Sequence, residues 1–264
     1  MSTLEIQQSQ SKVASRAIPM PPSGGLELTI DLRRVVALIL LIISILIVSG
    51  TAANIISNQV APSKDHKLAR LMNRFDLAFE PSIPNWYSSC SLLLCGVVLA
   101  VIARAKARSK GGWFWHWAVL AAIFVGLSID EGVRLHEMLH TVIASRIETH
   151  GLLYFPWVIP ALFFVAIVGL CYVPFLLRLD RRTAVLFVIA GAIYVMGAVG
   201  MDMIGGVIVE QHGMESIHHS FAQAVEELLE MLGVLIFLYA LLDYVRCHIG
   251  AVRLSLSPVG RKAF

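Results

Sequence analysis

Long apolar runs separated by short polar connections dominate the chain from residue 35 onward. Each run is long enough to cross the hydrocarbon core of a bilayer, which takes about 20 apolar residues in a helix. Helices are expected because lipid offers the backbone no hydrogen-bond partners. The predicted spans are residues 35–56, 86–103, 113–129, 153–177, 183–209 and 221–245. The pattern therefore predicts an all-α fold, a polytopic bundle of six transmembrane helices.

Three segments outside the spans have patterns of their own. Residues 1–34 are polar and contain three prolines, which predicts a flexible cytoplasmic tail, and residues 246–264 form a second predicted tail. In the first outer connection, five apolar residues recur at helical spacing among charged ones: Leu68, Leu71, Met72, Phe75 and Phe79. This spacing predicts an amphipathic helix that lies in the membrane interface.

Composition narrows the class of protein further. With 57% hydrophobic and 15% charged residues, the chain is too apolar to bury its side chains in one soluble core. Soluble enzyme folds, disulfide scaffolds and disordered chains are therefore excluded, and the lipid bilayer is the first expected partner. The net charge of +3 is small, and no basic stripe with interleaved aromatic residues accompanies it. We therefore expect no nucleic-acid partner.

The distribution of Lys and Arg predicts the orientation. Of the 21 basic residues, 15 lie before the first span, in the second and fourth connections, or after the sixth span. The positive-inside rule assigns these segments, and with them both termini, to the cytoplasmic side.

Acidic residues and histidines gather on the opposite surface. Seven of the nine histidines are there, together with six acids in or beside the spans: Asp130, Glu131, Asp202, Glu226, Glu227 and Glu230. An ionised carboxylate in a span costs about 2.5–3.5 kcal/mol, so these acids require compensation. A bound metal cation, shared protons or a water-filled vestibule would provide it. The alternative is that they are solvated helix ends near the headgroups.

The segment after the third span contains an HExxH motif, formed by His136, Glu137 and His140. On a helix, this spacing places two imidazoles on one face, where they can bind zinc while the glutamate acts as general base. Glu137 and Asp130 are the predicted catalytic residues. The predicted ligands of a divalent metal, zinc rather than iron, are His136, His140, Glu131, Glu226, Glu227 and Glu230.

A second interpretation uses two ExxH pairs, Glu137 with His140 and Glu215 with His218. Repeated ExxH pairs and additional glutamates are typical of di-iron sites in helical bundles. His218 and His219 are expected on a short outer connection, where they are ligands, a lid or a solvated loop. Asp202 is a further candidate.

Three motifs carry a resemblance to a known family. They are PNWYSS at residues 84–89, SIDE at 128–131 followed by His136 and Glu137, and EELLEMLG at 226–233. In these motifs the chain resembles a set of uncharacterised bacterial polytopic membrane proteins, over about residues 35–245. The resemblance implies a six-span fold in the bacterial inner membrane, and it implies no activity. In such a membrane, the distribution of Lys and Arg predicts that the site faces the periplasm.

Three classes of function remain open. The first is a metalloenzyme at the outer interface, either a zinc hydrolase or a di-iron oxidase that acts on a lipid or peptide. The second is a proton- or cation-coupled transporter or channel component, which a homo-oligomer would favour. The third is a non-catalytic membrane assembly subunit.

Overall fold

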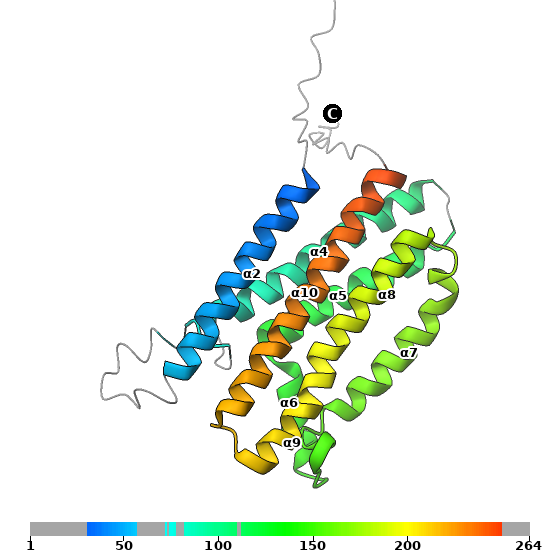
Figure 1. Ribbon diagram of the computed structural model, residues 1–264. Coiled ribbons are helices and arrows are strands. Elements are labelled where there is room, and N and C mark those ends of the chain that lie inside the picture. Colours follow the sequence, from blue (N-terminus) through cyan, green and yellow to red (C-terminus); the bar gives the residue numbers. More distant parts are fainter. Residues whose placement is uncertain (1–30, 57–71, 73, 78–81, 110–111, 250–264) are drawn as a thin grey trace, which may run out of the picture. The chain divides into compact units, whose positions relative to one another are not determined.

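The computed structural model describes residues 31–56, 72, 74–77, 82–109 and 112–249 (Figure 1). All regular secondary structure in these ranges is helical. Six segments are long and apolar enough to cross a membrane: Leu32–Ile55, Ile83–Arg108, Phe114–Val133, Val158–Leu176, Arg181–His212 and Ile217–His248. The predicted all-α fold with six spans is therefore confirmed, and the chain is an integral membrane protein.

Ten helical elements make up the described parts of these spans and their connections. They are α2 (Leu32–Ile55), α4 (Ile83–Arg108), α5 (Phe114–Val133), α6 (Leu135–Ala144), η2 (Gly151–Leu153), α7 (Val158–Leu176), α8 (Arg181–Val195), η3 (Met196–Met201), α9 (Asp202–His212) and α10 (Ile217–His248). The fifth span combines α8, η3 and α9. Its middle part, η3, is a π-helical turn, a rare insertion that often accompanies functional sites.

The fourth span begins later than the sequence predicted. Residues 150–157 form a 3₁₀ turn and a short connection before α7 starts at Val158. Glu210 of α9 fixes this connection, because its carboxylate accepts a hydrogen bond of 2.9 Å from the backbone N–H of Gly151. The side chain of His150 also contacts Glu210, at 3.1 Å.

Several predicted features lie outside the described residues. Residues 1–30 and 250–264 hold most of the two predicted tails, and Leu68, Leu71 and Phe79 hold most of the predicted interfacial helix. The described part of that connection folds against α2. Asn54 donates a hydrogen bond of 2.8 Å to the buried carboxylate of Asp76.

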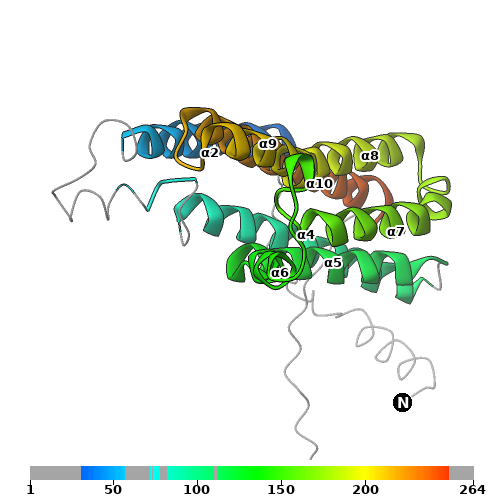
Figure 2. The same ribbon diagram turned by 90° about the horizontal axis from the view of Figure 1, so that it is seen from below.

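The helices form two layers, and α10 belongs to one of them. Figure 2 shows α2, α10 and α8 in one layer, α4 and α5 in the other, and α7 between the levels of α8 and α5. The core between the layers contains Leu99 of α4, Trp117 of α5 and Leu241 of α10, all almost fully buried. Because α10 contacts both layers, it holds the bundle together.

One end of the bundle carries a network of ion pairs. The buried carboxylate of Asp243 lies 3.3 Å from Arg182 and 2.7 Å from Arg246. Asp180 accepts a hydrogen bond from the backbone N–H of Thr183 at the start of α8 and lies 3.5 Å from His248. Burial raises the pKa of Asp180, but the hydrogen bonds from Thr183 and the charge of His248 outweigh it and lower the pKa. Basic residues that the charge pattern assigned to the cytoplasmic side therefore lie together at one end of the bundle.

Candidate functional site

The HExxH motif lies on a helix of its own. The third span does not continue into it, because α5 ends at Val133 and Arg134 adopts a left-handed conformation with φ 59°. Helix α6 then begins at Leu135. Asp130, in the last turn of α5, stabilises this new start, since its carboxylate accepts a hydrogen bond of 2.8 Å from the backbone N–H of His136.

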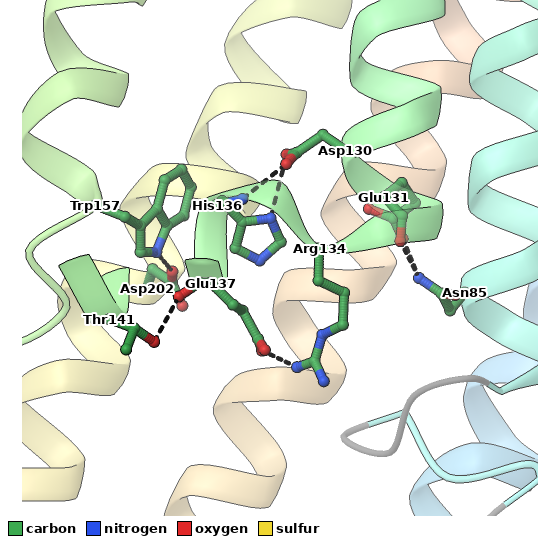
Figure 3. Close-up of polar contacts among 9 residues, drawn as sticks. All are labelled: Asn85, Asp130, Glu131, Arg134, His136, Glu137, Thr141, Trp157 and Asp202. Carbon is green, nitrogen blue, oxygen red and sulfur yellow. Dashed lines mark hydrogen bonds and ion pairs between the residues drawn. The ribbon is translucent and has the colours of Figure 1, made fainter. Parts of the chain in front are cut away.

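The same carboxylate also binds the ring of His136. Nδ1 of His136 lies 3.1 Å from the second oxygen of Asp130 (Figure 3). Burial lowers the pKa of His136, but the hydrogen bond and charge of Asp130, with the charges of Asp202 and Glu131, outweigh burial and raise the pKa. His136 is therefore held in one orientation and is biased toward its protonated form.

Trp157 connects His136 to the fifth span. Its ring centroid lies 5.0 Å from that of His136, and its indole N–H donates a hydrogen bond of 2.7 Å to the carboxylate of Asp202 (Figure 3). Asp202 is the first residue of α9, directly after the π-helical turn. Side chains from α5, α6, α9 and the segment before α7 thus form one polar group.

The other two HExxH side chains have different partners. Glu137 forms an ion pair with Arg134, and its carbonyl accepts a hydrogen bond of 3.0 Å from Thr141 (Figure 3). The ring of His140 lies 5.8 Å from that of Phe155.

The predicted acids of three helices come together next to this group. Asn85 of α4 donates hydrogen bonds of 2.7 and 3.3 Å to the carbonyl and the carboxylate of Glu131. Glu226 and Glu230 of α10 interact electrostatically with Glu131 and Asp202. Glu227 belongs to the same cluster. Acids from the third, fifth and sixth spans therefore lie close to one another in the structure.

A glycine allows the fifth span to approach these glutamates. A Cβ atom on Gly197 would lie 2.9 Å from Cγ of Glu230 and 3.0 Å from the backbone of Glu226 and Glu230. The π-helical turn and α10 therefore pack backbone against backbone at this point.

Sequence reasoning missed two residues of the site. Trp157 contacts both His136 and Asp202. Tyr194 of α8 interacts electrostatically with Glu230, Glu131 and Asp130. Tyr194 is positioned by Gly233, where a Cβ atom would lie 2.8 Å from Cβ of Tyr194. No motif marks either aromatic residue, because their partners lie far away in the sequence.

The remaining candidates lie elsewhere. Glu215 is exposed in the connection between α9 and α10, and the exposed His218 has its ring 4.6 Å from that of His212. The expectation that His218 and His219 lie on a loop is wrong, because Ser216 caps α10 and both histidines lie in its first turn. His219 is buried near Gly205.

No three His, Cys, Asp or Glu side chains in the described part of the chain are arranged to hold a metal ion. The predicted ligand set, His136 and His140 with Glu131, Glu226, Glu227 or Glu230, therefore stays a prediction.

A cavity of about 630 Å³ extends from the polar group into the bundle. Helices α5, α7, α8 and α10 provide most of its walls, and most of the lining side chains are apolar. Five of the described lining residues carry polar side-chain atoms: Asp130, His136, Trp157, Tyr172 and Tyr194. The lining runs along α7 from Pro160 to Leu176, about 24 Å at the helical rise of about 1.5 Å per residue. Asp130, His136 and Trp157 lie at the α6 end of this length.

No curated protein and no solved structure matches the chain. A family model with the description "Domain of unknown function (DUF8692)" matches residues 35–245. This range overlaps each of the six spans found in the described residues and contains every residue of the polar group. The protein therefore belongs to the DUF8692 family.

Proposed function

We propose that this integral membrane protein binds a lipid in the cavity between α5, α7 and α8. The observation that carries the proposal is the distribution of lining residues. A cavity of about 630 Å³ has mostly apolar walls along its length, and Asp130 and His136, the acid and the histidine among its described lining residues, lie together at one end. The volume is within the range of about 300–1,000 Å³ that is usual for small-molecule sites.

The dimensions of the cavity favour a lipid chain over a peptide. Each methylene group that leaves water contributes about 0.8 kcal/mol, so a long apolar channel binds an alkyl chain well. A peptide would bring backbone N–H and C=O groups against walls that offer few partners, at a cost of several kcal/mol for each unpaired group. The headgroup of the lipid would lie beside Asp130, His136 and Trp157.

Helix α7 separates this cavity from the bilayer. One face, with Phe164 and Val168, lines the cavity. The opposite face exposes Phe163, Ile167 and Leu170, as expected for side chains in contact with lipid tails. A chain from the bilayer could therefore exchange into the cavity past a single helix.

A photoreactive hexadecanol, bound to the full-length protein in detergent, tests the proposal. We expect cross-links at partly buried lining residues such as Val168 and Val195. Gly169 lines the cavity and has open space at its Cβ position, so Gly169→Phe fills the cavity and should lower labelling about tenfold or more. The matched control is Leu170→Phe on the exposed face of α7, which should label like wild type. Labelling confined to exposed residues, or unchanged in Gly169→Phe, would contradict the proposal.

We propose a divalent metal at His136 and His140 as a second candidate, and one observation supports it. A carboxylate that binds one ring nitrogen of a histidine orients the other nitrogen toward a metal, and Asp130 contacts Nδ1 of His136 in this way. The histidines are one helical turn apart on α6. A third ligand would come from the acid cluster, and zinc fits this donor set better than iron. Bound zinc would acidify its water for hydrolysis of a lipid.

A further inference from the structure

We infer that the lipid in the cavity carries a cationic headgroup, as in a single-chain amine. This inference rests on the proposed function and adds the chemical class of the ligand. Its basis is the combination of an apolar channel with carboxylates from three spans at one end.

Asp130 is the acidic residue that faces the cavity directly. Its two oxygens accept hydrogen bonds from the backbone N–H and the ring of His136. An ionised carboxylate has about four acceptor positions, so Asp130 can accept further bonds while both contacts to His136 remain. An ammonium group has three donors and no acceptor, which matches this unused capacity.

Further negative charges lie behind Asp130. The charges of Glu131 and Asp202 act on His136, and the charges of Glu131 and Asp130 act on Tyr194, which lines the cavity. Arg134, the basic residue at the break before α6, forms an ion pair with Glu137. The charges of Asp130, Glu131 and Asp202 all act on the single imidazole of His136. Three carboxylates outweigh one imidazolium, so the field at this end favours a cationic headgroup over a phosphate, sulfonate or carboxylate.

Aromatic rings complete the cationic site. Trp157 and Tyr194 both line the cavity near Asp130. The faces of indole and phenol rings attract ammonium groups, and Trp attracts them most strongly. The indole N–H of Trp157 is bonded to Asp202, so it is not available to an anionic headgroup.

Competition against the photoreactive hexadecanol separates the possible headgroups. Hexadecylamine, hexadecanol and hexadecanesulfonate share one chain and differ in charge. For wild-type protein near neutral pH we expect hexadecylamine to compete at least about tenfold better than the sulfonate, with the alcohol between them. Asp130→Asn and Asp202→Asn should reduce the advantage of the amine over the alcohol about tenfold and leave binding of the alcohol in place. Glu215→Gln, which removes an exposed charge in the connection between α9 and α10, should keep the wild-type order.

Two failures are distinguishable. If the sulfonate competes as well as the amine while Gly169→Phe still abolishes labelling, the cavity binds lipid and the inference about charge is wrong. If no compound competes and Gly169→Phe labels like wild type, the proposed function fails, and the inference fails with it. Should Asp130→Asn not fold, because it supports the start of α6, Asp202→Asn decides the question.

Discussion

Asp130 holds His136 by two nitrogen atoms, the backbone N–H at 2.8 Å and the ring Nδ1 at 3.1 Å. The two residues belong to different helices, separated by the left-handed Arg134. One carboxylate therefore starts α6, orients the first histidine of the HExxH motif and faces the cavity. The start of α6 and the polar end of the cavity therefore depend on the same side chain.

The protonation of His136 should depend on Asp130. Because burial lowers the pKa of His136 and Asp130 is the main group that raises it, Asp130→Asn should shift this pKa downward. A titration of the histidine side chains by NMR measures the shift in detergent-solubilised protein. A pKa of His136 that is the same in wild type and Asp130→Asn would contradict the assigned contact.

The stability of the protein should depend on pH through the same residue. A pKa raised in the folded state stabilises the fold below the unfolded value of about 6.5, and this contribution is lost as pH rises through the folded-state pKa. Thermal unfolding from about pH 5 to about pH 9 should show this loss in wild type and a smaller one in His136→Gln. His150→Gln, which alters an exposed pair with Glu210, should resemble wild type. Parallel curves for wild type and His136→Gln would contradict the prediction.

Gly197 should be intolerant of a side chain. The Cβ atom of Gly197→Ala would meet the backbone of Glu226 and Glu230, which cannot move aside without shifting α10. Overpacking of this kind costs about 1–3 kcal/mol, so the variant should unfold at a lower temperature. Gly191→Ala is the control in the same span, because a Cβ atom there has open space. Equal melting temperatures for the two variants would show that the close approach does not exist.

Elemental analysis of purified protein tests the proposed metal. If this second candidate holds, wild type contains near-stoichiometric zinc, which is lost in His136→Ala and His140→Ala and retained in His150→Ala, because His150 contacts Glu210 on a different connection. Iron in place of zinc would favour an oxidase over a hydrolase. Folded wild-type protein purified without chelators and free of both metals would rule the metal site out.

The orientation of the bundle can be measured by cysteine labelling. The positive-inside rule places the connection at residues 109–113 in the cytoplasm and residues 145–157 outside. In a variant without the four native cysteines, Ser145→Cys should react with a membrane-impermeant maleimide in intact cells. Ser109→Cys should react only after the cells are permeabilised. The reverse pattern would invert the predicted topology.

The gathering of acids at the site could be predicted in part from the sequence. The charge pattern assigned Asp130, Glu131 and Glu230 to the same surface, and the structure brings their helices together, since Glu131 acts on Glu230. The sequence could not show that Arg134 breaks the helix, because a left-handed residue there depends on the capping contact from Asp130. It also could not assign Trp157 and Tyr194, whose partners are more than 20 residues away.

By itself, the sequence determined the six spans and the segregation of basic from acidic residues. These are local properties, since the length and hydropathy of a segment decide whether a helix can cross the bilayer. Tertiary structure decided the polar group around His136, the cavity, and the exclusion of Glu215 and His218 from the site. These features form at contacts between helices that are distant in the sequence. The packing of side chains across those contacts determines which residues meet, and no local sequence pattern encodes it.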